Sequence, residues 1–307
     1  MKTTSAWAHG LFVGLTVMVL GTGRCGETPS DPSANSLTIA TYNIRFFGDE
    51  SKDLPALQAV VRAVDPAVLA LQEVRDDEAP VALASALSDG TRRYRAVSAR
   101  CGGRGNLHVA FVYDEARVEC VGMREFPTMG PGGDGSCSES DRAALAGTFV
   151  SRATQTRSTL VSVHLAAMGT EERVAQRKSQ WKRLFALVDH LRATDGGAVV
   201  LLGDTNSTGW SDNAHDERRF IEEGASRSGL EIATRALVCS EYWTPRVGHY
   251  EPSMLDHVLA DPGAVDPASV SVRGYCAGFG CQRVESAVPP REYQHVSDHC
   301  PVVARLR

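Results

Sequence analysis

The chain has 307 residues, of which 43% are hydrophobic and 22% are charged, and its formal net charge is −5. This composition excludes a disordered chain and supplies enough apolar side chains for one large core or two modest ones. The negative balance excludes a global basic field for nucleic acid or anionic membranes, although it leaves room for a local basic patch.

The beginning of the chain has the pattern of an export signal followed by a linker. An apolar stretch at 10–20 is too short to span a membrane and is typical of a secretory signal. We therefore expect 1–23 to be a signal peptide and 24–35 to be a polar linker. Lipid anchoring at Cys25 is the less favoured alternative, because Arg24 stands where a lipobox carries a small residue. The predicted location is secreted or periplasmic.

Strand and helix patterns alternate through the remainder of the chain. Residues at helical spacing predict amphipathic helices at 54–64 and 171–191. Mostly apolar segments of strand length lie at 37–48, 67–74, 109–114, 160–165, 198–204, 254–260 and 300–306. Many strands, few helices and Gly-rich loops indicate one layered domain of α/β type that runs from residue 36 to residue 307.

Eight cysteines in a chain with an export signal predict disulfide bonds. Cys300 lies in an apolar strand pattern, so we expect a buried free thiol there. Cys276 and Cys281 are close enough in sequence to close a small loop. With Cys25 in the linker, the other candidates are Cys101, Cys120, Cys137 and Cys239. Six cysteines allow about 15 pairings, and the sequence does not select among them.

Polar side chains recur where the predicted strands end. Taken singly, an Asp at a strand end is usually a turn former, and a lone His is usually a satisfied side chain. Repetition at strand after strand favours a different explanation, because the strands of one sheet end along a common edge and their side chains can converge on one cleft. These residues are Asn43, Glu73, His164, Asp204, Asn206, Asp256, Asp298 and His299.

The residue types at these positions indicate a particular chemistry. Carboxylate and amide oxygens are hard ligands that suit Mg²⁺ or Ca²⁺, and no Cys–His spacing resembles a zinc site. Two histidines can exchange protons with water and a leaving group, and a neighbouring carboxylate can hold one of them in a single tautomer. No Ser or Cys stands in a nucleophile-elbow setting. The pattern predicts metal-assisted hydrolysis of a phosphate ester.

Six motifs resemble, in order, those of the endonuclease/exonuclease/phosphatase superfamily, and within it most closely those of the deoxyribonuclease I family. The resemblance spans residues 36–307. It implies a four-layer α/β/β/α sandwich of the α+β class and metal-dependent hydrolysis of phosphodiesters or phosphomonoesters. The motifs are TYNIRFFG (41–48), LQEVRD (71–76), VHLAA (163–167), GDTN (203–206), LDHVL (255–259) and SDHCPV (297–302).

The resemblance implies a metal site built from three of these residues. Glu73 corresponds to the main metal ligand, and Asn43 lies beside it. Asp298 corresponds to a residue that binds the metal or orders water. The expected cofactor is Mg²⁺, with Ca²⁺ or Mn²⁺ as alternatives, because the donors are hard oxygens.

Five further residues correspond to the catalytic set of the family. His299 resembles the general base, and Asp256 resembles the carboxylate that orients it. His164 resembles the group that stabilises or protonates the leaving oxygen. Asp204 and Asn206 resemble the residues that position the phosphate and the nucleophile.

Arg45, Arg75 and Arg142 match arginines that contact the DNA backbone in deoxyribonuclease I. They predict a nucleic acid substrate, with DNA favoured over RNA. Two departures concern the loop at 101–109. It lacks the tyrosine that enters the DNA minor groove, and Leu107 stands near the place of a glutamate that pairs with the leaving-group histidine.

Three alternatives share the same motifs. VHLAA also resembles the inositol polyphosphate 5-phosphatases, but these enzymes carry arginine after the aspartate of LDHVL, where this chain has His257. Sphingomyelinases are exported and share the catalytic set. The third alternative is a non-catalytic binding module on the same fold, and the complete set of proton-transfer and metal-binding residues argues against it.

Overall fold

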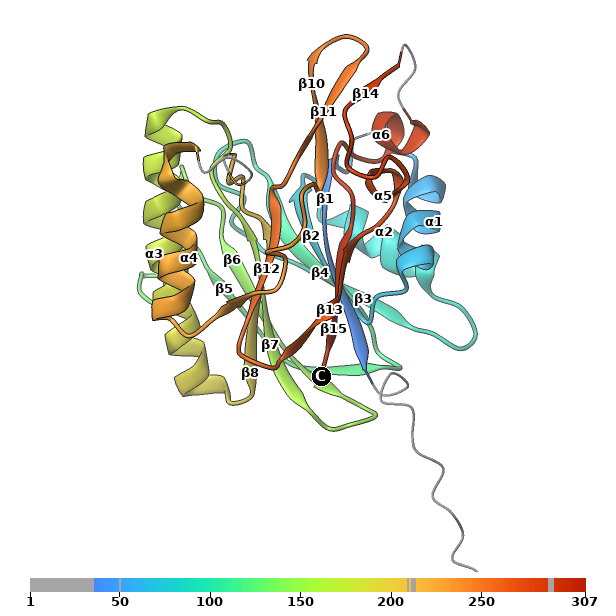
Figure 1. Ribbon diagram of the computed structural model, residues 1–307. Coiled ribbons are helices and arrows are strands. Elements are labelled where there is room, and N and C mark those ends of the chain that lie inside the picture. The colour runs from blue at the N-terminus through green and yellow to red at the C-terminus, as the bar shows by residue number, and fades with distance from the viewer. Residues whose placement is uncertain (1–35, 50, 209, 211–213, 287–289) are drawn as a thin grey trace, which may run out of the picture. The chain divides into compact units, whose positions relative to one another are not determined.

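Two six-stranded mixed β-sheets lie face to face in the computed structural model, and helices cover the outer face of each sheet (Figure 1). The structure describes residues 36–49, 51–208, 210, 214–286 and 290–307. The predicted signal peptide and polar linker lie outside these residues. The layer order α/β/β/α confirms the four-layer sandwich of the α+β class.

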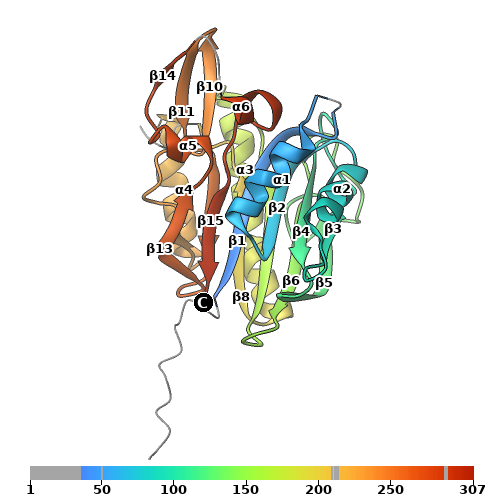
Figure 2. The same cartoon turned by 90° about the vertical axis from the view of Figure 1, so that its right-hand side faces the viewer.

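The first sheet has the strand order β13-β15-β1-β2-β4-β3. Its central strand β1 pairs in parallel with β2 and antiparallel with β15, and residues 39–44 of β1 are buried. Helices α1 and α2 cover its outer face (Figure 2). The bounds are β1 Leu37–Phe47, β2 Val68–Val74, β3 Tyr94–Ser98, β4 His108–Asp114, β13 Val265–Val272, β15 Val302–Leu306, α1 Leu54–Val64 and α2 Glu78–Leu87.

The second sheet has the strand order β5-β6-β7-β8-β12-β9. Strands β7 and β8 are parallel and almost wholly buried, as expected for two strands joined by the crossover helix α3. Helices α3 and α4 cover the outer face of this sheet. The bounds are β5 Val118–Phe126, β6 Ala144–Ser151, β7 Arg157–His164, β8 Ala198–Asp204, β9 Glu231–Ile232, β12 Asp256–Ala260, α3 Glu171–Asp195 and α4 Glu217–Arg227.

A smaller three-stranded sheet extends from one end of the sandwich (Figure 1). It consists of the hairpin β10–β11 and the short strand β14. Two short helices, α5 and α6, lie near it, and the 3₁₀ helix η1 precedes α4. The bounds are β10 Glu241–Arg246, β11 His249–Ser253, β14 Val284–Glu285, α5 Tyr275–Gly278, α6 Arg291–His295 and η1 Ala214–Asp216.

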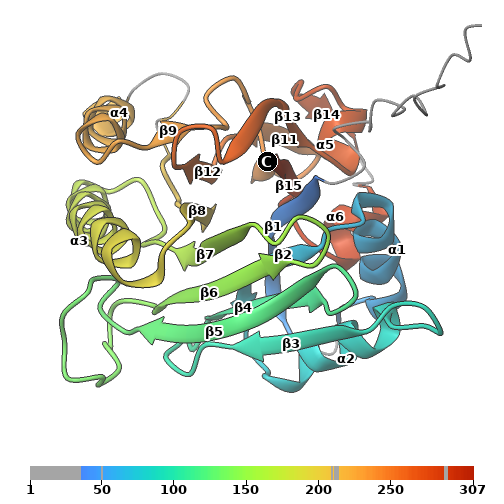
Figure 3. The ribbon, with the colours of Figure 1, turned by 90° about the horizontal axis from the view of Figure 1, so that it is seen from below.

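Figure 3 shows the layers from below, and apolar side chains pack between them. Ile39, Phe111 and Phe149 lie between the two sheets. Trp181 and Leu184 of α3 lie between the second sheet and its helices. Each such buried side chain contributes about 1.5–3 kcal/mol from the removal of apolar surface from water. Within the described residues, no helix is both long enough and apolar enough to cross a membrane.

Two of the cysteine predictions are wrong. Cys300 is not a free thiol but is bonded to Cys276, and Cys281 is bonded to Cys239. The small loop between Cys276 and Cys281 therefore does not form a disulfide. The reason is tertiary: the short helix α5 brings Cys276 against the start of β15, where its backbone N–H lies 3.2 Å from the Cys300 sulfur.

The third disulfide joins Cys101 to Cys137. Cys120, which was among the expected disulfide candidates, is a partly buried free thiol, and burial raises its pKa. Three disulfides among the described residues are typical of a protein that matures in an oxidising compartment.

Candidate active site

Three of the predicted residues are direct neighbours across strands of the second sheet. His164 at the end of the parallel strand β7 is in register with Asp204 at the end of β8. Asp204 is also in register with Asp256 at the start of the antiparallel strand β12. The three side chains therefore meet at one edge of the sheet, as the strand-end pattern predicts.

The facing edge of the first sheet is shaped by an irregularity between β1 and β2. Residues 44–46 of β1 stand opposite Glu73 alone, because the register shifts after Asn43. The Asn43 amide donates hydrogen bonds to Glu73 Oε1 at 3.3 Å and to Asp204 Oδ2 at 2.8 Å. Asn43 is fully buried. The first strand ends in polar side chains because its end lies at the junction of the two sheets.

Three residues at this junction have a strained backbone conformation. Arg45, Glu73 and Asn206 have positive φ values of 35°, 60° and 51°. A non-glycine residue in this conformation costs on the order of 1–3 kcal/mol, and it persists where the surrounding contacts hold it. Those contacts are present: the backbone N–H of Asn206 donates to Asp204 Oδ1 at 2.9 Å, and the backbone N–H of Phe46 donates to Glu73 Oε2 at 3.2 Å.

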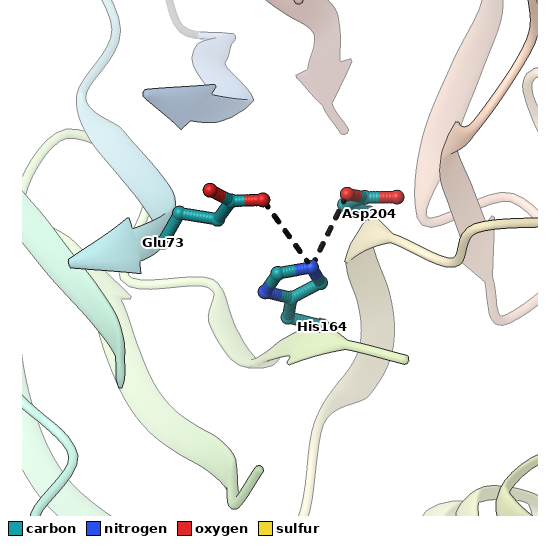
Figure 4. A group of neighbouring side chains, drawn as sticks. All are labelled: Glu73, His164 and Asp204. Carbon is teal, nitrogen blue, oxygen red and sulfur yellow. Dashed lines mark ion pairs between the residues drawn. The ribbon is translucent and has the colours of Figure 1, made fainter. Parts of the chain in front are cut away.

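Glu73, His164 and Asp204 form a candidate metal centre (Figure 4). One donor atom from each lies within 4.8 Å of the others. His164 Nε2 is 3.4 Å from Asp204 Oδ2 and 3.9 Å from Glu73 Oε1. Two closely placed carboxylates in a largely buried site need a compensating positive charge. The two carboxylates of this centre fit a divalent cation that prefers oxygen ligands, and His164 Nε2 lies beside them.

Asp298, the third predicted metal residue, lies outside that group. Its carboxylate pairs with Arg45, with Oδ2 at 3.0 Å from Nη1. The backbone carbonyl of Asp298 accepts a hydrogen bond from the Tyr242 N–H at 2.9 Å. Asp298 is therefore placed at the rim of the site, where it orients an arginine.

His164 is held in its neutral form. Burial lowers the pKa of His164 well below 6.5, and the charges of Arg142 and His299 lower it further. Its Nδ1 atom is buried and has no hydrogen-bond partner among the described residues. Leu107, which stands near the place expected for a glutamate partner, is buried.

His299 lies between carboxylates on both sides of its ring. Nδ1 is 2.8 Å from Asp256 Oδ2, whereas Nε2 is 3.2 Å from Glu241 Oε2 and 3.9 Å from Asp204 Oδ2. Burial alone would lower the pKa of His299, but the attraction of these carboxylates, with Asp256 first, raises it well above 6.5. Asp256 is fully buried, and its backbone N–H donates to Ser240 Oγ at 2.9 Å.

Glu241 is the site residue that the sequence analysis missed. It is the first residue of β10, forms an isolated β-bridge with His299 and is nearly buried. Burial raises its pKa, and the neighbouring carboxylates of Asp298 and Asp204 act in the same direction, while His299 opposes them. No strand-end pattern precedes Glu241 in the sequence, so only its contact with His299 reveals it.

The three predicted arginines have different surroundings. Arg142 donates from Nη1 to the Leu165 carbonyl at 3.0 Å, but its Nε atom is buried and has no partner in the part of the chain that the structure describes. Burial lowers the pKa of Arg142, and the negative charges of Glu73 and Asp204 counteract that effect. Arg45 and Arg75 are substantially exposed. The Arg75 guanidinium stacks over the Phe46 ring, with Cζ 3.9 Å from the ring centroid, and its Nη1 lies 3.0 Å from Asp49 Oδ2.

The four-layer sandwich with a polar site at the edges of both sheets is the architecture of a class of phosphoester hydrolases. Residues 40–299 match the model of the Endonuclease/Exonuclease/phosphatase family. The chain therefore belongs to this family, whose members are hydrolases that act on phosphoester bonds and typically depend on a divalent metal. No curated protein sequence matches the chain.

Solved structures with the same fold come from bacteria and from humans. The endonuclease/exonuclease/phosphatase from Bacteroides vulgatus is 16% identical with a TM-score of 0.64, covering 89% of this chain and 98% of its own. The mannosyl-6-phosphatase of Bacteroides thetaiotaomicron is 17% identical with a TM-score of 0.58, and the match covers 89% of this chain and 100% of the phosphatase chain. The human Nocturnin catalytic domain with a bound sulfate is 16% identical with a TM-score of 0.59, and the match covers 89% of this chain and 94% of the Nocturnin chain. At these identities the likeness concerns the fold alone.

Proposed function

We propose that this chain is a secreted, metal-dependent phosphodiesterase that cleaves nucleic acid, with DNA favoured over RNA. The observation that carries the proposal is the buried Asp256–His299 pair, which lies beside Asp204 and the candidate metal centre. A histidine held in this way can activate water next to a phosphate that neighbouring groups hold. The incomplete hydrogen bonding of Arg142 supports an anionic ligand.

In the proposed reaction, His299 takes a proton from the attacking water. Asp256 accepts the hydrogen bond from Nδ1–H, so the lone pair of neutral His299 is on Nε2, which faces the site. Glu241 lies beside that nitrogen at 3.2 Å and can accept a hydrogen bond once Nε2 carries the proton. The imidazolium that forms is stabilised by a carboxylate on each side.

Glu73 and Asp204, with Asn43 beside them, would hold Mg²⁺, with Ca²⁺ or Mn²⁺ as alternatives. Such a cation supplies Lewis-acid polarisation of the phosphoryl oxygen. Asp298 orders the rim of the site through its ion pair with Arg45. Asn43 holds Glu73 and Asp204 in place through its two hydrogen bonds.

The remaining residues would act on the phosphate and the leaving group. Asn206 donates from its amide to the Leu165 carbonyl at 3.2 Å, which keeps its side chain at the edge of the site beside Asp204. His164 is neutral and can stabilise the leaving oxygen by a hydrogen bond from Nε2–H. Arg142 supplies a guanidinium charge with an unused N–H donor.

Nucleic acid is favoured by the distribution of exposed charge at the end of the first sheet. Arg45 and Arg75 follow Asn43 and Glu73 and are both exposed enough to contact a phosphate backbone. An inositol phosphate is less well supported. His257, which replaces the arginine of the inositol phosphatases, is buried against Trp210 and lies 3.1 Å from the Thr234 hydroxyl, so it does not contribute charge to the site.

A substrate panel tests the proposal. Purified protein would be assayed with Mg²⁺ on single- and double-stranded DNA, RNA, sphingomyelin vesicles and an inositol phosphate. We expect DNA to be cleaved fastest. The His299→Ala variant, purified by the same procedure, should be inactive. Faster turnover of sphingomyelin or inositol phosphate than of DNA would reject nucleic acid as the substrate. Equal activity of the variant would remove His299 from the mechanism, and turnover of nothing on the panel would favour the binding module.

A further inference from the structure

The β10–β11 hairpin presents a second side chain to the same side as Glu241. Side chains alternate along a strand, so Glu241 and Trp243 share one face of β10 and Tyr242 takes the other. Tyr242 is buried, and its hydroxyl donates to the Gln282 carbonyl at 2.7 Å. Trp243, by contrast, is 50% exposed. An indole therefore projects next to the residue that contacts the proposed general base.

Trp243 lines a pocket that opens beside the site. The pocket has a volume of about 660 Å³, which is within the range of sites for small organic ligands. Its inner wall includes Asn206 and Glu241, so it is continuous with the proposed site. Met168, from the loop after β7, also lines it and is 66% exposed. These two large apolar side chains belong to different elements, and both remain open to solvent.

The chemistry of the walls limits what can bind there. Among the described residues that line the pocket, Glu241 is the single ionisable one, and there is no lysine or arginine. The pocket is therefore unsuited to a second phosphate or to the polyanionic backbone. An indole and a thioether offer flat and adaptable apolar contact, and the amide of Asn206 and the hydroxyls of Thr208 and Ser253 can hydrogen-bond to polar edges.

We propose that this pocket holds an unpaired nucleobase next to the scissile phosphate, with its ring stacked on Trp243. The inference rests on the proposed nuclease function and adds a substrate preference to it. A base inside a duplex is paired and stacked, so it cannot reach the indole without leaving the helix. The preferred substrate is therefore single-stranded. A quaternary ammonium group is the weaker candidate, because it is recognised by several aromatic faces and the second indole of the pocket, Trp210, is buried.

Loss of the indole has a predictable effect on binding. Base–aromatic stacking corresponds to a factor of about 5 to 150 in affinity per base. Trp243→Ala should raise KM for a single-stranded oligonucleotide by that factor and leave kcat nearly unchanged, since among the described residues no hydrogen bond or ring contact joins the Trp243 side chain to a proposed catalytic residue. Trp243→Phe keeps an aromatic face and should stay near wild type. Val247→Ala at the exposed hairpin tip, outside the pocket lining, is the matched control.

The experiment compares one single-stranded DNA oligonucleotide with the same strand carrying one abasic nucleotide beside the cleaved phosphate, and with its duplex. The effect of Trp243→Ala should disappear on the abasic strand, and wild type should prefer the single strand to the duplex. If Trp243→Ala leaves KM unchanged, or raises KM equally on the intact and the abasic strand, the inference is overturned while the nuclease function stands. If wild type cleaves none of these substrates, the proposed function and the inference fail together. Faster hydrolysis of phosphatidylcholine or sphingomyelin vesicles, with Trp243→Ala reducing it, would assign the pocket to choline.

Discussion

Asp256→Asn tests whether the buried carboxylate sets the tautomer of His299. In wild type Asp256 Oδ2 lies 2.8 Å from His299 Nδ1, and the carboxylate is fully buried. An asparagine amide that donates to Nδ1 would leave the proton on Nε2, and a ring protonated there cannot accept a proton from water. The expected loss is the contribution of general-base catalysis, about 10²–10⁴ in rate.

The same substitution should change the pH dependence in a defined direction. The attraction of Asp256 is the leading contribution that raises the pKa of His299, and it opposes burial, which lowers it. The base must be neutral, so the wild-type rate rises as pH increases through this elevated pKa. Without the charge at position 256, only Asp204 and Glu241 still oppose the effect of burial, so the pKa of His299 falls. The rising limb of the residual activity should therefore move to lower pH.

Single-turnover rates on the best substrate, measured across pH at saturating Mg²⁺, provide the assay. Asp256 is not in the candidate metal centre, so the metal concentration for half-maximal activity should stay near that of wild type. His299→Ala and the double variant serve as comparators, because two residues that act as a unit lose no more together than His299→Ala alone. A rate within a few-fold of wild type, or fully additive losses, would remove the pair from the mechanism.

Three further predictions concern the metal, the substrate and the disulfides. Exhaustive EDTA treatment should abolish activity and Mg²⁺ should restore it, whereas Glu73→Gln should stay inactive at Mg²⁺ levels that saturate wild type; full turnover without metal would contradict this. Arg142→Ala should raise KM for DNA and reduce the log–log salt slope of binding by roughly 0.7–0.9, and an unchanged slope in a binding titration would exclude a phosphate contact. Replacing Cys239 and Cys281 together by serine should lower the free energy of unfolding by about 2–4 kcal/mol in denaturant titrations, since this disulfide spans 42 residues; an unchanged midpoint would reject its stabilising role.

Local sequence signals were sufficient for several elements. The predicted helix at 54–64 and the strand at 198–204 have the same bounds in the structure. Asp53 caps the N-terminus of this helix, because its side chain accepts a hydrogen bond from the Ala56 N–H, and a proline lies in the first turn. The predicted helix at 171–191 continues to Asp195, because the amphipathic pattern becomes polar before the helix ends at glycine. Periodicity and end signals act over a few residues, so they can be recognised without the fold.

The polar strand ends were also recognisable, because β-sheet geometry brings such ends together. His164, Asp204 and Asp256 meet in cross-strand register, as the common-edge argument requires. The sequence could not show which of these side chains lie in the candidate metal centre and which lie at the rim of the site. Asp204 lies with Glu73 and His164, whereas Asp298 pairs with Arg45 at the rim. This division depends on the irregular register of β1 and β2, which has no local signature.

The amino-acid sequence by itself determined a layered domain and the kind of chemistry, because both follow from residue types and their spacing along the chain, and its motifs, through their resemblance to a known family, implied the four-layer fold class. Only the tertiary structure decided the disulfide pairing, the contact of Glu241 with His299 and the pocket beneath Trp243. Each of these depends on contacts between segments that are distant in sequence. Such contacts are selected by the packing of the whole domain, and no single segment encodes them.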